Sequence, residues 1–228
     1  MPLADIPRIG TGTVVRDARQ FRHIGETVST FLNAGGRLID TAPSYKVQPK
    51  LASALAKWPR DVLWVTSKIP LVAMGYEPTL RQVNATLEEL RTPWVDLMLI
   101  HRPNNSPGPK GDKEQQVTRR LRLSSFRALL DARAAGLVRH VGVSNYGVAY
   151  LNELAEAGLP MPFANELEFH PFIETRQWAL VRRCQALGIR IIAYNSLGGL
   201  GALRDAPPTL AAIAAAHRAT PAQVMLRL

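Results

Sequence analysis

Val95-Asp-Leu-Met-Leu-Ile-His101 is a run of mostly apolar residues that ends on a histidine. A continuous apolar run of this length is typical of a parallel strand that is buried on both faces. Runs of similar character recur along the chain, and stretches with helical periodicity separate them. Alternation of this kind predicts a parallel sheet covered by helices.

Working outward from this run, we predict seven strands. They lie at Arg8–Val15, Arg37–Asp40, Val62–Lys68, Val95–His101, Val138–Val143, Phe163–Glu168 and Ile189–Tyr194. Predicted helices lie at Ile24–Ala34, near Lys50–Ala56, and at Thr79–Leu90, Leu123–Ala135, Val148–Ala157, Glu174–Leu187 and Leu210–Ala216, with one more opening at Thr220. We interpret Pro103–Arg122 as a long surface loop that borders a binding site, and Gly198–Gly201 with Pro207-Pro208 as a second loop.

The regular spacing, with no GxGxxG after the first strand, favours a barrel over an open Rossmann sheet. We therefore expect an α/β fold in one domain over residues 1–228. It is an incomplete (β/α)8 TIM barrel with about seven of its eight strands. A length of 228 residues is slightly short for a complete barrel.

The bulk composition restricts the possible partners and compartment. Cys184 is the only cysteine, so no internal disulfide can form and a reducing, cytoplasmic compartment is expected. We find no secretory signal and no apolar stretch long enough for a bilayer, so we expect no membrane partner. The net charge of +10 favours anionic partners, but few basic residues cluster and no aromatics are interleaved, so we expect a solvated basic surface and no nucleic acid.

Polar residues follow the carboxyl ends of successive strands, where barrel active sites are found. They are Asp40, Tyr45, Lys68, His101, Ser144, Asn145, Asn165, Glu166, Tyr194 and Asn195. Each of the first four also has a structural interpretation: a helix cap for Asp40, an exposed loop aromatic for Tyr45, a solvent-reaching Lys68 and a hydrogen-bonded interior His101. Their coincidence at successive strand ends favours a common site.

Several ordered motifs resemble the aldo-keto reductase family, from about Ile9 to the C-terminus. The first is Asp40-Thr-Ala-Pro-Ser-Tyr45, which is similar to the family's Asp-Thr-Ala-x-x-Tyr signature. The others are Thr66-Ser-Lys68, Leu99-Ile-His-Arg-Pro103, Val141-Gly-Val-Ser-Asn145, Asn165-Glu-Leu-Glu-Phe-His-Pro171 and Ala193-Tyr-Asn-Ser-Leu197. Agreement of several motifs in the family's order is far more specific than any single pattern.

The resemblance implies a catalytic tetrad of Asp40, Tyr45, Lys68 and His101 that reduces an aldehyde or ketone to an alcohol. A free tyrosine is a reluctant acid at neutral pH, and a nearby Lys68 ammonium is expected to lower the pKa of Tyr45. Asp40 would hold Lys68 charged and oriented. His101 would donate a hydrogen bond to the carbonyl oxygen.

The resemblance also implies a nicotinamide cofactor, NADP(H), with NAD(H) left open, and no metal ion. Tyr194 would stack on the nicotinamide, and Ser144 and Asn145 would bind its carboxamide. Thr13 would lie near the ribose. The pyrophosphate would lie near Asn195, Ser196 and Leu197.

The sequence departs from the family pattern at several positions. Glu166 stands where the family usually has Gln, and an ionised Glu there would accept only and would favour the oxidised, positively charged nicotinamide. Val14 and Arg102 replace two common Trp residues and would line the substrate pocket. Arg102 either pairs with a substrate carboxylate or points to solvent. In the helix after Tyr45, the residues Val47, Gln48 and Ala52 replace the family's Asn-Glu and Gly.

The family's eighth strand and the loop that binds the adenosine 2′-phosphate have no counterpart before Leu228. We expect a shortened form of a working enzyme, itself a poor enzyme. A complete barrel is expected to be a monomer, whereas open strand edges would allow self-association. The alternative to a reductase of small carbonyls is a catalytically impaired or non-catalytic barrel that binds nicotinamide weakly or serves as a partner subunit.

Overall fold

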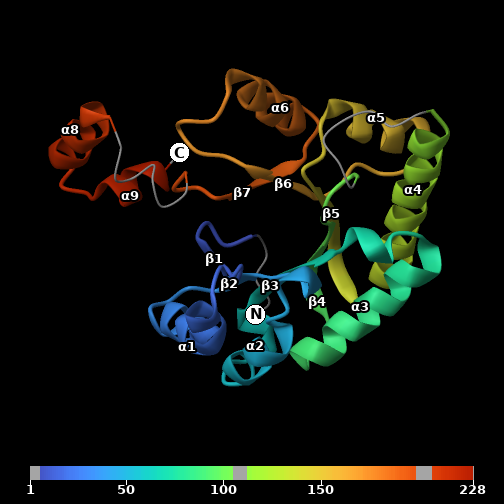
Figure 1. Cartoon of the computed structure of the whole chain (residues 1–228), viewed down its shortest axis with the longest axis horizontal. Coiled ribbons are helices and arrows are strands. Elements are labelled where there is room, and N and C mark those ends of the chain that lie inside the picture. The colour runs from blue at the N-terminus through green and yellow to red at the C-terminus, as the bar shows by residue number, and fades with distance from the viewer. Residues whose placement is uncertain (1–5, 105–111, 199–206, 228) are drawn as a thin grey trace.

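The computed structural model describes residues 6–104, 112–198 and 207–227. Seven parallel strands form one sheet whose spatial order follows the chain. The strands are β1 (Gly10–Gly12), β2 (Leu38–Asp40), β3 (Trp64–Ile69), β4 (Val95–Ile100), β5 (Val138–Ser144), β6 (Ala164–Glu168) and β7 (Arg190–Tyr194). The sheet curves around an interior, and the helices lie on its outside (Figure 1).

Helices follow the strands along the chain. They are α1 (Ala18–Asn33), α2 (Gln48–Leu55), α3 (Tyr76–Leu90), α4 (Asp112–Ala134), α5 (Val148–Glu156), α6 (Thr175–Ala186), α8 (Pro208–Ala216) and α9 (Pro221–Met225). Short 3₁₀ turns are η1 (Pro43–Tyr45), η2 (Arg60–Val62) and η3 (Leu71–Ala73). In Figure 1, α8 and α9 lie together to the left of β7.

The predicted fold class is confirmed. Every predicted strand is present, and seven parallel strands in a nearly closed barrel match an incomplete (β/α)8 barrel. Among the described residues, the pairing runs from β1 to β7 without a pairing of β7 with β1. The single-domain assignment stays a prediction.

Two predicted boundaries were wrong. Helix α1 begins at Ala18, six residues before the predicted start, because the side chain of Asp17 caps it by accepting from the amide of Gln20 at 2.8 Å. The predicted loop Pro103–Arg122 is a helix from Asp112 onward. Its residues are mostly good helix formers, and α4 is anchored by buried Arg122 and Leu123, so the polar composition was misleading. Residues 105–111 and 199–206, which carry the rest of both predicted loops, lie outside the described residues.

Alternate residues of each strand point into the barrel, which places the site residues on one inner row. Below that row, an inner apolar layer fills the barrel; it consists of Leu38, Trp64, Leu97, Leu99 and Ala164. Gly142 of β5 faces this layer, and a Cβ there would lie 2.6 Å from the Leu99 side chain and 2.7 Å from the Ala164 carbonyl oxygen. The packed layer closes the barrel beneath its carboxyl-end mouth.

Candidate active site

Lys68 occupies the centre of the barrel mouth. It is the fifth residue of β3, and its side chain is 0% exposed. Its ammonium pairs with Asp40 of β2 and lies 3.3 Å from Glu166 Oε1 of β6. Burial by itself disfavours the ammonium, but the charges of Asp40 and Glu166 outweigh it and raise the pKa of Lys68. Lys68 is therefore a permanent buried cation.

Tyr45 reaches Lys68 from the loop after β2. The turn η1 carries Tyr45, and Lys46 ends the turn in the left-handed region at φ 58°. The Lys68 ammonium lies 5.3 Å from the centroid of the tyrosine ring. Burial raises the pKa of Tyr45, and the charges of Asp40 and Glu166 add to that effect against the opposing charge of Lys68. Lys68 lowers the pKa of Tyr45 as expected, but burial has the larger effect, so the net shift of this pKa is upward.

His101 lies beside Tyr45 at the end of β4, with the two rings edge to face at 5.7 Å between centroids. Burial, together with the charges of Lys68 and Arg102, lowers the pKa of His101 to about 4. The imidazole is thus neutral at neutral pH and has one N–H to donate. Ser44 lies 3.5 Å from its Nδ1 through Oγ. Sequence analysis missed Ser44, although it lies within the motif that ends at Tyr45.

A chain of hydrogen bonds joins the ends of β5, β6 and β7. The Tyr194 hydroxyl donates to Asn145 Oδ1 at 2.9 Å, and Asn145 Nδ2 donates to Ser144 Oγ at 3.0 Å and to the carbonyl of His101 at 3.1 Å. Ser144 Oγ donates to the carbonyl of Glu166 at 3.1 Å. The network fixes a half-exposed Tyr194 ring next to the tetrad.

Glu166 points toward the tetrad rather than along the rim. Its side chain is 5% exposed, and Oε1 faces the Lys68 ammonium. Its burial and the neighbouring Asp40 raise the pKa of Glu166 to about 8, in spite of Lys68. The raised pKa disfavours the ionised form of Glu166 in this buried, acidic surrounding, and the effect of Glu166 on the cofactor stays a prediction.

The remaining predicted cofactor residues lie around this mouth. Thr13 is fully buried, and its hydroxyl donates to the carbonyl of Asp40 at 3.0 Å. After β7, Asn195 donates to Glu168 Oε1 at 2.7 Å, and Ser196 donates to the Ala193 carbonyl at 3.2 Å. Their roles toward a cofactor, and that of half-buried Leu197, stay predictions.

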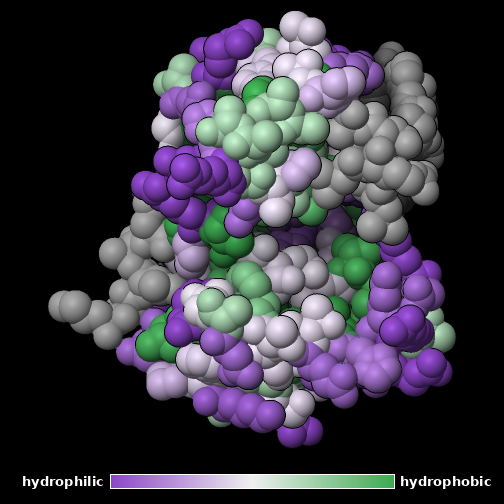
Figure 2. Space-filling model, turned by 90° about the vertical axis from the view of Figure 1, so that its left-hand side faces the viewer, coloured by the Kyte–Doolittle hydropathy of each residue, from purple (hydrophilic) through white to green (hydrophobic). Residues whose placement is uncertain are grey.

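The two predicted pocket residues are exposed. Val14 is 57% exposed after β1, and Arg102 is exposed next to His101. The positive charge of Arg102 contributes to the lowered pKa of His101, so Arg102 affects the site electrostatically without a direct contact. Figure 2 shows the side of the molecule on which α8 and α9 lie, hollowed in its middle with hydrophobic surface on both flanks.

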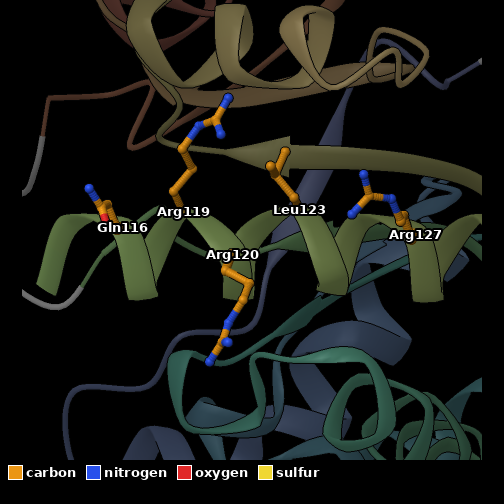
Figure 3. A pocket seen from close by; sticks show the side chains of 5 residues that line it. All are labelled: Gln116, Arg119, Arg120, Leu123 and Arg127. Atoms are coloured by element: carbon orange, nitrogen blue, oxygen red, sulfur yellow. The ribbon is translucent and has the colours of Figure 1, made fainter. Parts of the chain in front are cut away.

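The arginines of the segment Arg119–Arg122 contribute to helix packing. Arg122 is buried and forms a two-pronged ion pair with Glu153 of α5, with a shortest distance of 2.6 Å, and Arg119 reaches Glu156 at 3.0 Å. A separate hollow of about 220 Å³ on α4 is lined by Gln116, Arg119, Arg120, Leu123 and Arg127. In Figure 3 the Arg120 side chain points away from the side taken by Arg119 and Leu123. The arginines therefore do not converge on one ligand.

Two kinds of feature are absent from residues 6–104, 112–198 and 207–227. No group of three or more His, Cys, Asp or Glu residues there is arranged to hold a metal ion. In the same part of the chain, no helix is long and apolar enough to cross a membrane.

A parallel barrel that gathers a tyrosine, a lysine, an acid and a histidine at the carboxyl ends of its strands defines a barrel enzyme. The chain belongs to the aldo/keto reductase family, whose model matches residues 8–227. The predicted class, an NAD(P)H-dependent oxidoreductase, is thereby confirmed.

Relatives and solved structures agree with this assignment. The chain is 34% identical over 203 residues to methylglyoxal reductase DkgB of Salmonella typhimurium, covering 88% of this chain and 70% of the relative. It is 33% identical to DkgB of Escherichia coli O157:H7 over 97% of this chain and 77% of the relative. An aldo/keto reductase from Brucella melitensis superposes with a TM-score of 0.81 at 31% identity, over 97% and 79% of the two chains. A Bombyx mori aldo-keto reductase in complex with NADP gives a TM-score of 0.83 at 27% identity, over 97% and 76%.

Proposed function

We propose that this protein reduces a small aldehyde or ketone to an alcohol by hydride transfer from NADPH, with Tyr45 as the proton donor. The observation that carries the proposal is the convergence of Tyr45, His101 and Lys68 from three different loops and strands onto one buried point of the barrel mouth. Neither the Tyr45–His101 contact nor the Lys68–Tyr45 contact belongs to the strand pairing that forms the barrel.

The residues at the end of the sheet fit a nicotinamide. A half-exposed aromatic ring, Tyr194, is held in place by Asn145, and polar groups of Ser144 and Asn145 lie next to it. An aromatic face suits a planar ring, and amide and hydroxyl groups suit its carboxamide. The Bombyx mori relative in complex with NADP and the net charge of +10 support NADP(H) over NAD(H).

The cofactor supplies the hydride, which no side chain can supply. Tyr45 and neutral His101 flank the position for the substrate oxygen, so both can donate a hydrogen bond to it. The Tyr45 hydroxyl passes its proton to the oxygen as negative charge develops there. The Lys68 ammonium stabilises the resulting phenolate, and Asp40 neutralises and orients that ammonium.

The DkgB relatives act on methylglyoxal by name, and we propose a small carbonyl of that size as the substrate. Val14 and Arg102 stand at the rim of the site. Arg102 places a positive charge next to His101, which favours substrates that carry an anionic or strongly polar group beside the carbonyl.

The test is NADPH-dependent reduction of methylglyoxal by the wild type and by Tyr45→Phe. The variant keeps the ring but loses the proton, so we expect the rate to fall by about 10²–10⁴-fold while NADPH still binds. A matched control is Tyr76→Phe, which removes the hydroxyl of an exposed tyrosine bonded to Asp131 and should leave the rate unchanged.

Near-normal turnover by Tyr45→Phe would remove Tyr45 from the proton-donor role. Wild-type protein that binds NADPH but reduces neither methylglyoxal nor other small aldehydes would instead support a non-catalytic barrel.

A further inference from the structure

The barrel mouth holds more buried acid than its cation can neutralise. Lys68 is the single ammonium, and both Asp40 and Glu166 face it with side chains that are 17% and 5% exposed. With all three groups ionised, the cluster would carry a net negative charge beneath the site of reduction. Such a charge is costly where so little water reaches it.

Two oxygen atoms of the cluster lack hydrogen-bond partners. Asp40 Oδ2 and Glu166 Oε2 are both buried, and neither has a donor within reach in the described structure. A carboxylate oxygen can only accept, but a protonated carboxyl can donate. Both carboxyl groups contact the same Lys68 ammonium, and each leaves one oxygen without a partner, so one proton held between them would satisfy the missing bond.

We propose that Glu166 is a positioning residue that shares one proton with Asp40, and that this proton keeps the Lys68 cluster neutral while the site binds the reduced cofactor. Loss of the proton makes the cluster anionic and shifts binding toward the oxidised cofactor. The effect on cofactor binding rests on the proposed function. The shared proton itself is a property of the protein without cofactor.

The groups that face Glu166 determine when this proton is lost. They are Asp40 of β2, Lys68 of β3, Tyr45 of η1 and Tyr194 of β7. The pKa values of Lys68, Tyr45 and Tyr194 are all raised from values near or above 10, and that of neighbouring His101 is lowered to about 4. The pKa of Glu166, raised to about 8, therefore stands apart from theirs.

The cofactor test compares Glu166→Gln with the wild type. Gln keeps the size of the side chain and can donate and accept, but it cannot ionise. Fluorescence titrations between pH 6 and pH 10 would give the ratio of the Kd values for NADPH and NADP+, in which ionisation common to both cofactors cancels. In the wild type we expect the ratio to shift by about tenfold in favour of NADP+ as the pH passes 8, from one added charge near the nicotinamide. In Glu166→Gln the ratio should stay flat.

Infrared spectroscopy tests the shared proton without any cofactor. The wild type should show the carbonyl stretch of a buried protonated carboxyl group at pH 7, and this band should vanish above pH 8. Glu166→Gln should lack the band. The matched control, Glu168→Gln, removes a carboxyl from the same strand whose side chain is 40% exposed, and it should keep the band.

Unfolding provides a second cofactor-free measurement. The folded protein holds a proton that the unfolded chain releases near pH 4.3, the ordinary value for Glu, so stability should fall as the pH rises from there to about 8. Glu166→Gln should lose this part of the pH dependence.

The outcomes separate the two proposals. An infrared band that is absent at pH 7, or that survives in Glu166→Gln, overturns the shared proton whether or not the enzyme turns over. A band that behaves as expected, together with a Kd ratio that does not change with pH, overturns the link to the cofactor. A failure to reduce methylglyoxal, with the infrared band and the Kd ratio as expected, would count against the proposed function and not against the shared proton.

Discussion

Asp96, at the amino end of β4, and Asp40, at the carboxyl end of β2, are both acids that pair with buried or half-buried cations. Asp96 is 1% exposed, and both of its oxygens have partners: Oδ2 accepts from Arg60 at 2.6 Å and from the amide of Val65 at 2.9 Å, while Oδ1 accepts from Arg139 at 2.9 Å. Asp40 pairs with Lys68 through one oxygen and leaves the other without a partner.

The difference separates a cluster that holds the fold from one that is arranged for chemistry. At the amino end, the guanidinium groups of Arg60 and Arg139 also lie over the Trp94 ring, 4.9 Å and 4.4 Å from its centroid. Each guanidinium therefore contacts both the Asp96 carboxylate and an aromatic ring. At the carboxyl end, unused hydrogen-bonding capacity and a raised carboxyl pKa persist inside the protein. The buried indole nitrogen of Trp94 at the amino end also lacks a partner, but an indole does not exchange a proton at ordinary pH, so the two ends differ in their carboxyl groups.

The largest effect that sharpens this comparison is expected from Lys68→Met. The variant removes the ammonium that stabilises the Tyr45 phenolate, so reduction of methylglyoxal should slow by about 10³-fold. Stability should change much less. Burial raises the pKa of Glu166 to about 8, so Glu166 depends little on Lys68 for its charge, and Asp40 keeps partial access to water. Steady-state kinetics and urea unfolding of the same preparation check both statements.

Asp96→Ala should give the opposite pattern. It leaves the guanidinium groups of Arg60 and Arg139 without their acid and the buried amide of Val65 without an acceptor. We expect the free energy of unfolding to fall by about 3 kcal/mol, at the lower end for a broken buried pair because both arginines reach some solvent. The turnover of the folded molecules should stay within about twofold of wild type, since the cluster lies at the end of the barrel opposite the site.

Asp131→Ala is the control for that measurement, because it removes an exposed acid that accepts a bond from the Tyr76 hydroxyl. Its cost should stay within about 0.5 kcal/mol. If Asp96→Ala slowed reduction as much as Lys68→Met, or if Lys68→Met unfolded the protein as readily as Asp96→Ala, the division between the two clusters would be lost.

Sequence patterns predict one cluster far better than the other. Asp40, Lys68 and His101 each stand where an apolar run ends, and the barrel brings such ends together, so their proximity follows from strand order alone. The contact of Glu166 with Lys68 crosses the barrel from β6 to β3, and only the curvature of the sheet creates it. Arg60, Asp96 and Arg139 are far apart in sequence and belong to no motif, so nothing in the sequence singles them out.

The error in α4 has a related cause. Arg122 appears in the sequence as one of several solvated arginines, but its partner Glu153 lies 31 residues away on α5 and makes it a buried contact between helices. Local polarity predicts exposure only when no distant group of opposite charge packs against it. The strands were predictable because their pattern is local, whereas the paired charges depend on the assembled fold.

The smallest predicted effect concerns how each end responds to acid. His140 of β5 lies at the amino end of the barrel between Trp64 and Phe163, with ring centroids 5.5 Å and 3.9 Å away. Burial, helped by the charge of Arg133, lowers the pKa of His140 from its ordinary value of 6.5. The unfolded chain therefore binds a proton more readily than the folded one, and stability is lost as the pH falls below about 6.5.

His140→Phe removes that proton site and keeps an aromatic ring in the stack, so the drop in melting temperature between pH 7 and pH 5 should become smaller. His217→Phe is the control, because it changes an exposed histidine at the end of α8 and should leave the drop as it is in the wild type. His101 at the other end also has a lowered pKa, and it keeps part of the acid sensitivity in either variant. A drop that is unchanged in His140→Phe would mean that the amino end does not respond to acid in this range. The loss of stability in acid would then come from the carboxyl end of the barrel, where His101 lies. The amino end would contribute to stability in a way that does not depend on pH in this range.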